Sequence, residues 1–256
     1  MATKKLAVLV VHGIGSQGPD FADGMTREVR RRLERAKMDP DLVVWKTVHW
    51  APIVEEVEKA YWKRAKRDAR LRFENLRSFV VSVLSDAIAY QETNDRGFYT
   101  EIQARIAADV ATLHAEAGAV PLVVMAHSLG GILMQDYIWD VRKRGSKRGK
   151  RGFERFSTMK RFITFGSNIP LFAIMHRDPW PPSLPSSCRW LNYYDPDDIL
   201  GWPLRSINDR YRRAVHKDIP VSVGGPLTSW NPASHLRYWT DNDFTRPVAE
   251  ELAGLL

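Results

Sequence analysis

The chain has 256 residues, a formal net charge of +8 and 44% hydrophobic residues, enough apolar material for one large core. Its single cysteine, Cys188, excludes an intrachain disulfide, and nothing in the composition requires an oxidising compartment. The longest apolar run, 79–90, is interrupted by Asp86 and is too short to span a bilayer. We therefore expect one soluble, cytoplasmic domain over residues 1–256.

The first predicted strand, Leu6–Val11, is a continuous apolar run, which is typical of a strand buried on both faces of a parallel sheet. A glycine-containing loop follows it, and apolar residues at steps of four from Phe21 to Leu33 predict a helix. A second strand is predicted at 42–50. This order indicates a βαβ unit, in which ligands bind at the carboxyl ends of the strands.

A long amphipathic segment runs from residue 54 to 90. Apolar residues recur there every three or four positions, and the positions between them up to Arg77 are mainly Lys and Arg. The basic half suits contact with an anionic membrane surface or with phosphate, and a solvated helix face that covers the core is the alternative. We expect one or two helices, as an insertion that acts as a lid, a peripheral membrane contact or a core cover.

The rest of the chain continues the alternation of strands and helices. Strands are predicted at 121–125, 162–165, 190–194 and 219–223, and helices at 99–113, 132–141 and 244–255. The basic run 142–152 indicates a surface loop; nucleic-acid binding there is unsupported by any recognised module. Residues 170–187 hold five prolines and predict no regular structure, so their apolar side chains suit the rim of a substrate pocket.

The segment from Ala126 to Gly131 joins a predicted strand to a predicted helix, with Ser128 at the junction. A sharp turn at this point needs small neighbours, which Ala126 and Gly130 provide. The turn places the Ser128 hydroxyl at a helix N-terminus, where free N–H groups stabilise a developing negative charge. The pattern predicts a nucleophile elbow; a serine N-cap of an ordinary helix is the alternative.

A nucleophilic serine needs a histidine base and a carboxylate that orients it. In a sheet of this kind the nucleophile, the acid and the histidine follow one another along the chain, and the histidine lies in the loop after the final strand. His235 follows the last predicted strand and therefore fits this position. Asp195, Asp197 and Asp198 all follow the predicted strand 190–194, and turns favour aspartate in any case. Position alone therefore leaves three candidates for the acid.

From Leu6 to the closing helix the chain resembles α/β hydrolases of the lipase and esterase kind. The resemblance rests on an oxyanion loop at 12–15, the elbow at 126–131, Gly166 with Ser167, an acid loop at 198–203 and a histidine loop at 234–238. It implies the α/β-hydrolase fold, a mostly parallel sheet with helices on both faces and a helical insertion. It also implies that Asp198 is the acid, because the family's catalytic aspartate precedes an aliphatic pair and a nearby proline.

The function that the resemblance implies is hydrolysis of a small-molecule or lipid ester by Ser128, His235 and Asp198, through an acyl-enzyme intermediate. The backbone N–H groups of Ile14 and Leu129 would bind the oxyanion. The expected substrate contacts are Phe172, Met175, Trp180 and Trp202. No cofactor or metal is expected, and the sequence carries no signal for an oligomeric state.

A non-catalytic binding or regulatory module on the same fold is the alternative function, because a fold alone does not imply chemistry. The catalytic interpretation requires that Ser128 is reachable and that His235 faces it. A buried serine, or a His235 that faces elsewhere while another imidazole takes its place, would contradict it.

Overall fold

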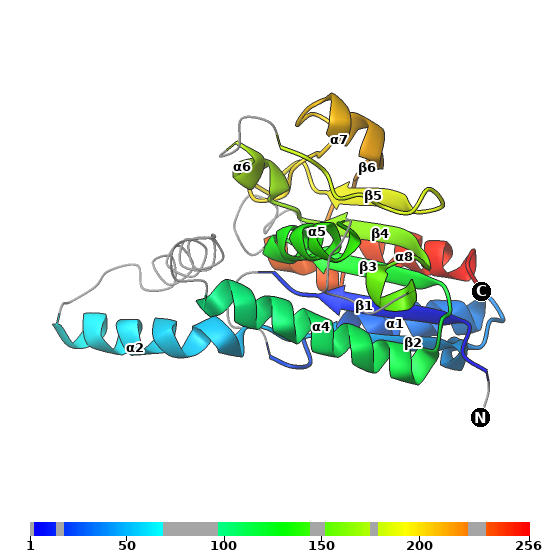
Figure 1. Ribbon diagram of the computed structural model, residues 1–256, viewed down its shortest axis with the longest axis horizontal. Coiled ribbons are helices and arrows are strands. Elements are labelled where there is room, and N and C mark those ends of the chain that lie inside the picture. The colour runs from blue at the N-terminus through cyan, green and yellow to red at the C-terminus, as the bar shows by residue number, and fades with distance from the viewer. Residues whose placement is uncertain (1–2, 14–17, 69–96, 144–151, 175–178, 225–233) are drawn as a thin grey trace.

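The computed structural model describes residues 3–13, 18–68, 97–143, 152–174, 179–224 and 234–256. Within them, six parallel strands form one sheet in the order β2-β1-β3-β4-β5-β6 (Figure 1). The strands are β1 (Leu6–Val11), β2 (Val43–Val48), β3 (Leu122–His127), β4 (Met159–Phe165), β5 (Arg189–Tyr194) and β6 (Val215–Pro220).

Helices cover both faces of this sheet (Figure 1). One face carries α4 (Gly97–Ala117) and α5 (Leu129–Arg142), and the other carries α1 (Asp23–Arg35) and α8 (Asn242–Ala253). The remaining elements are α2 (Pro52–Asp68), α6 (Ile169–Ala173), α7 (Asp209–Ala214), η1 (Pro40–Leu42), η2 (Gly152–Arg155) and η3 (Ser234–Trp239).

The continuous apolar run of β1 is explained by the two covered faces. Successive side chains of a strand point to opposite faces, and Ala7, Leu9 and Val11 join the core beneath α4 and α5. The alternate residues Leu6 and Val8 join the core with α1 and α8. Every residue of β1 is fully buried, so no polar alternation appears in its sequence. The fold class expected from the sequence is confirmed.

The strand order reverses between β1 and β3. After β1 the chain forms β2 on one side, and it then returns to form β3 on the other side of β1. Crevices at the carboxyl ends of such adjacent strands are the ligand sites of open parallel sheets. The loop that begins at His12 follows β1, and Ser128 follows β3, so both lie at this point of reversal.

Two sequence predictions are wrong in this part of the fold. The last strand is β6 at Val215–Pro220, not 219–223, and it contains His216. As the edge strand it exposes His216 and Lys217, so it lacks the apolar run that marks the central strands. The proline-rich segment was predicted to hold no regular structure, but it contains the short helix α6. Pro170 is compatible with this helix because it stands in the first turn, where a missing N–H costs no hydrogen bond.

The two basic segments are described only in part. The predicted helix within 54–90 is confirmed as far as Asp68, the end of α2, and the remainder of that segment lies outside the described residues. Most of the basic run 142–152 also lies outside them. No helix in the described part of the chain is long and apolar enough to cross a bilayer.

Candidate active site

Ser128 occupies a backbone conformation that L-residues rarely adopt, with φ 51° and ψ −126°, between the end of β3 and the start of α5. The turn is tight on both sides. A Cβ on Gly130 would come within 2.6 Å of the His12 carbonyl oxygen, and one on Gly13 within 2.4 Å of Ser128 Cβ. The elbow therefore packs directly against the start of the loop after β1, and only glycine fits at the two contacts.

The backbone around Ser128 fixes the elbow and leaves donors at its helix terminus. The Ser128 N–H donates to the Phe165 carbonyl of β4 at 3.0 Å, and Gly131 N–H donates to the Ser128 carbonyl at 2.9 Å. Leu129 is the first residue of α5, so its N–H has no acceptor within the helix. This N–H points out of the helix terminus and can bind an anion, so Leu129 stays a candidate oxyanion donor; Ile14, the second predicted donor, lies outside the described residues.

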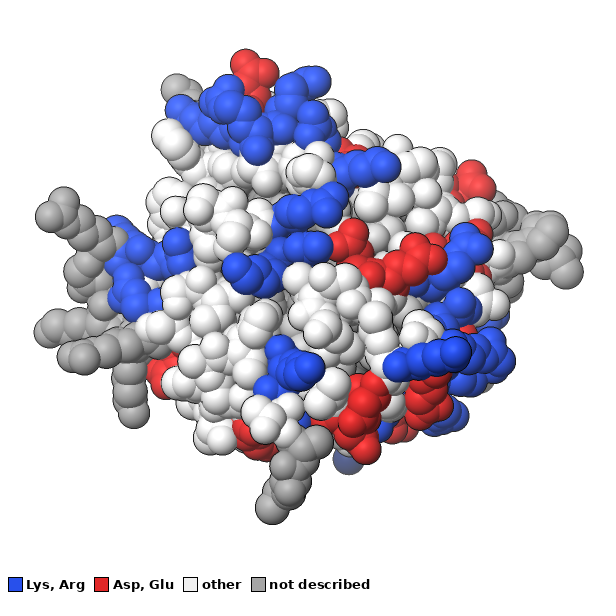
Figure 2. Space-filling model, turned by 90° about the vertical axis from the view of Figure 1, so that its right-hand side faces the viewer, with Lys and Arg blue, Asp and Glu red and all other residues white. Residues whose placement is uncertain are grey.

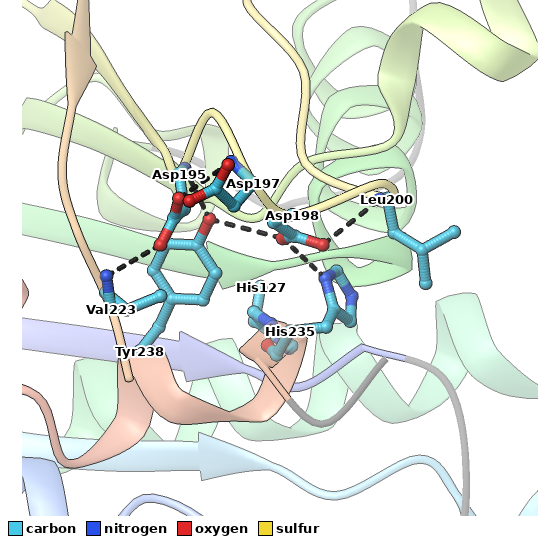
Figure 3. Close-up of polar contacts among 8 residues, drawn as sticks. All are labelled: His127, Asp195, Asp197, Asp198, Leu200, Val223, His235 and Tyr238. Atoms are coloured by element: carbon cyan, nitrogen blue, oxygen red, sulfur yellow. Dashed lines mark hydrogen bonds and ion pairs between the residues drawn. The ribbon is translucent and has the colours of Figure 1, made fainter. Parts of the chain in front are cut away.

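Asp198 and His235 meet in a buried hydrogen bond (Figure 3). Nδ1 of His235 donates to Oδ2 of Asp198 at 2.8 Å. The same oxygen accepts from the Tyr238 hydroxyl at 3.2 Å, and Oδ1 accepts from Leu200 N–H at 3.0 Å. Because the proton of the neutral imidazole is held on Nδ1, Nε2 keeps its lone pair and can act as a base.

Of the other two candidate acids, Asp195 holds the turn after β5 with its carboxylate. Asp195 accepts hydrogen bonds from Asp197 N–H at 2.8 Å and from Val223 N–H at 2.7 Å, and its own N–H donates to the Tyr238 hydroxyl at 2.7 Å (Figure 3). Asp197 is exposed. Among the three aspartates, Asp198 is the one that hydrogen-bonds His235 in the described structure, and it is the aspartate that the family resemblance implies as the acid.

Tyr238 links these two aspartates. Burial, followed by the nearby Asp198 carboxylate, raises the pKa of the Tyr238 hydroxyl far above its usual value. The hydroxyl therefore stays protonated and can donate to Asp198 while it accepts from Asp195 N–H. In the sequence analysis Tyr238 is only the last residue of the histidine loop 234–238 and has no role of its own.

His127, which precedes the serine, was missed as a functional residue by the sequence analysis. Its ring lies 4.7 Å from the His235 ring, centroid to centroid, and its Nε2–H donates to the His235 carbonyl at 2.8 Å. Complete burial lowers the pKa of His127 well below its usual value, so the ring is neutral. The elbow thus holds the backbone of the base through the residue next to Ser128.

His12 fixes the start of the loop after β1. Its Nε2 accepts hydrogen bonds from Trp50 N–H at 3.1 Å and Ala51 N–H at 3.3 Å, and its Nδ1–H donates to the Gly13 carbonyl at 2.7 Å. Burial lowers the pKa of His12 to about 3, so the imidazole is neutral and can accept and donate in this way. The ring also stacks on Trp50 at 4.8 Å.

The two atoms that would react are buried and unpaired. Ser128 has 0% of its surface exposed and His235 has 4%. Neither Ser128 Oγ nor His235 Nε2 has a hydrogen-bond partner among the described residues. The site is therefore closed to solvent, contrary to the reachable serine that the catalytic interpretation requires. A buried hydroxyl without a partner costs about 1–3 kcal/mol, which a purely structural serine would not retain without cause.

The four predicted substrate-contact residues do not lie together in one part of the described structure. The Trp202 side chain is 42% exposed, and its N–H donates to the Ser167 carbonyl at 3.0 Å, which places it beside the end of β4. Phe172 packs against the core on the α5 side. The ring of Trp180, 54% exposed, lies 3.3 Å below the Arg210 guanidinium of α7. Met175 lies outside the described residues.

No cluster of three or more His, Cys, Asp or Glu side chains that could hold a metal ion occurs within the ranges that the structure describes.

No protein-family model matches the chain, and a search of curated proteins finds no match. Among solved structures, a candidate hydrolase of the alpha/beta superfamily from Xanthomonas campestris pv. campestris is 12% identical, with 97% of this chain and 98% of that chain covered and a TM-score of 0.45. The RedJ thioesterase of the prodiginine pathway from Streptomyces coelicolor is 11% identical, with 99% and 87% covered and a TM-score of 0.44. At such low similarity these structures do not indicate which reaction the chain catalyses, so the proposal below rests on the geometry of the site.

The unpaired hydroxyl predicts that Ser128→Ala does not destabilise the protein. We expect the free energy of unfolding to stay the same or rise by about 1 kcal/mol, because the change removes a buried polar group that has no partner among the described residues. Denaturant unfolding of the variant and the wild type measures this difference.

Thr164→Val is the matched control. The Thr164 hydroxyl is also fully buried, but it donates to Asn192 Oδ1 at 2.9 Å and accepts from Trp190 Nε1–H at 3.0 Å. Its loss should cost about 1–3 kcal/mol. An equal loss of stability in Ser128→Ala would contradict the unpaired state of the serine.

Proposed function

We propose that this chain, which has the α/β-hydrolase fold, is a serine hydrolase of carboxylic esters. The observation that carries the proposal is the buried Asp198–His235 hydrogen bond, which directs the proton of the imidazole away from Nε2. The bond from His127 to the His235 carbonyl ties this base to the elbow that bears Ser128. A strained serine, a base and an oriented acid are the parts that acyl transfer needs.

In the proposed reaction, Ser128 Oγ attacks the ester carbonyl carbon while His235 Nε2 takes the hydroxyl proton. Asp198 stabilises the imidazolium that results. The carbonyl oxygen becomes an oxyanion and binds the Leu129 N–H, with Ile14 as the second proposed donor; each such donor is worth about 3 kcal/mol in the transition state. His235 then protonates the leaving alcohol, and water releases the acyl group from Ser128 by the reverse path.

The burial of Ser128 adds a step to this mechanism. With 0% of the serine exposed, an ester reaches Oγ only after the groups that cover the site move apart. Site opening on the microsecond-to-millisecond scale limits turnover in many enzymes. The proposal therefore includes an opening step before acylation.

Apolar side chains next to the triad support an acyl or lipidic substrate. Ile199 follows Asp198 directly and is 63% exposed, and Leu236 follows His235 and is 47% exposed. Trp202 lies in the same loop as Asp198. Exposed apolar side chains gathered at a site favour an apolar ligand over a polar one.

Contact of the 54–90 segment with an anionic membrane is a further part of the proposal, supported by the exposed Lys63 and Arg64 of α2.

A non-catalytic binding or regulatory module is the second candidate function. The observation that favours it is the complete burial of Ser128. A binding module does not use this hydroxyl as a nucleophile, so Ser128 can stay buried. Absence of ester turnover in a correctly folded wild-type protein would support this candidate.

The proposal predicts that the wild type hydrolyses p-nitrophenyl esters and that Ser128→Ala does not. Because exposed apolar residues, Ile199 and Leu236, follow Asp198 and His235 in the chain, kcat/KM should be higher for esters of medium or long acyl chains than for the acetate. Steady-state rates across the chain-length series test both points. Turnover that survives in Ser128→Ala would assign the activity to another group.

The choice of Asp198 as the acid predicts that Asp198→Asn lowers kcat by about 10³-fold or more. An amide in place of the carboxylate no longer stabilises the imidazolium or selects the Nδ1–H tautomer. Asp197→Asn is the matched control. It makes the same carboxylate-to-amide change in the same loop, at an aspartate whose side chain is exposed. Equal losses of kcat in the two variants would contradict the assignment.

Tyr238 should act as a positioning residue for Asp198. We expect Tyr238→Phe to lower kcat about tenfold with little change in KM, since a hydrogen bond to a charged group is worth about 1.5 kcal/mol. Tyr211→Phe is the control, because that buried hydroxyl bonds Gln135 at 2.9 Å instead. A purely structural role for Tyr238 predicts equal kcat values for the two variants at matched folded fractions.

A further inference from the structure

A hollow lies at the outer edge of the sheet, along the edge strand β6 and the last turn of α7, with a volume of about 540 Å³. Three cationic side chains, Arg205, Arg212 and Lys217, line it together with His216. Tyr194 and Ser206 also line it and carry hydroxyl groups. We propose that this edge pocket binds a phosphate group, as an inorganic anion or as part of a larger molecule.

The acidic groups near the edge pocket offset its cations only in part. Asp218 is the single acidic lining residue in the described structure, so the three lining cations exceed the lining carboxylates by two. Its Oδ1 accepts from Asn192 Nδ2 at 2.8 Å and Leu204 N–H at 2.9 Å, and its Oδ2 accepts from Arg205 N–H at 2.9 Å. Asp209 lies 3.9 Å from the Arg212 guanidinium and its side chain is 86% exposed, so this pair is weak.

Two of the donors are held in place before any ligand binds. Nη1 of Arg205 donates to the Val215 carbonyl at 2.8 Å and the His216 carbonyl at 3.0 Å, which fixes the plane of the guanidinium. The Arg189 guanidinium donates to His216 Nε2 at 2.9 Å, so the His216 proton is on Nδ1. A donor that is already ordered loses less side-chain entropy when an anion binds.

The chemistry of these donors favours phosphate over a single carboxylate. The planar guanidinium of arginine matches the spacing of two phosphate oxygens, and lysine adds a compact charge. Three cations suit an anion that carries about two charges at neutral pH. Lys and Arg side chains also gather at the top of Figure 2, the height at which Figure 1 places α7, whose Arg210 and Arg213 add positive potential around the pocket.

Titration calorimetry with inorganic phosphate tests the proposal on the intact chain. The double variant Arg212→Gln with Lys217→Gln removes two exposed cations of the pocket, and we expect the Kd for phosphate to rise about tenfold or more. The control double variant Arg213→Gln with Arg27→Gln loses the same charge at exposed positions outside the pocket lining. It should change the Kd less than about threefold, through long-range potential alone.

Two results overturn the proposal: no binding of millimolar phosphate by the wild type, or an equal loss of affinity in the two double variants. Sedimentation with phosphatidylcholine vesicles, with and without phosphatidic acid, separates the possible sources of the phosphate. Binding to the acidic vesicles alone, reversed by free phosphate, assigns a lipid headgroup. Phosphate binding without vesicle binding assigns a soluble phosphate compound. Ester turnover should be the same in both double variants, so this test is independent of the role of Ser128.

Discussion

The hydrogen bond between Asp198 and His235 is the interaction on which the candidate site depends. It joins residues 37 positions apart, from the loop after β5 and from η3. The parallel sheet makes this meeting possible, because the carboxyl ends of all its strands lie at one edge. Tyr238 and Leu200 then fix the carboxylate, and His127 fixes the backbone of the base. The candidate acid and the candidate base are therefore already ordered in this structure, as the proposed function requires.

The same site stores strain and leaves polar atoms unpaired. Ser128 has a positive φ and a hydroxyl without a partner in the described structure, and His235 Nε2 is also unpaired there. Each feature is unfavourable for folding, and such features persist where the surrounding structure determines them. The two cores on either side of the sheet and the glycine contacts at Gly13 and Gly130 supply that surrounding structure. Strain and unpaired atoms concentrated at one residue are typical of a functional site.

The sequence was sufficient for the central strands and for the sharp turn at Ser128, because buried parallel strands and a turn between small residues both leave strong local patterns. It could not place the edge strand β6, whose exposed His216 and Lys217 hide its periodicity. From residues alone three aspartates remained open, since the choice depends on a contact between distant loops. The burial of Ser128 and the role of His127 are likewise tertiary properties, set by segments far apart in the chain.

The central claim is that Ser128 is a nucleophile activated by His235 in a site that opens. Mass spectrometry of the intact chain after incubation with a fluorophosphonate tests it most directly, because this reagent captures an activated serine covalently. We expect one adduct, located on Ser128, that forms in the wild type and is lost in a folded His235→Gln variant. An unmodified wild-type chain, or an adduct on a different residue, would contradict it.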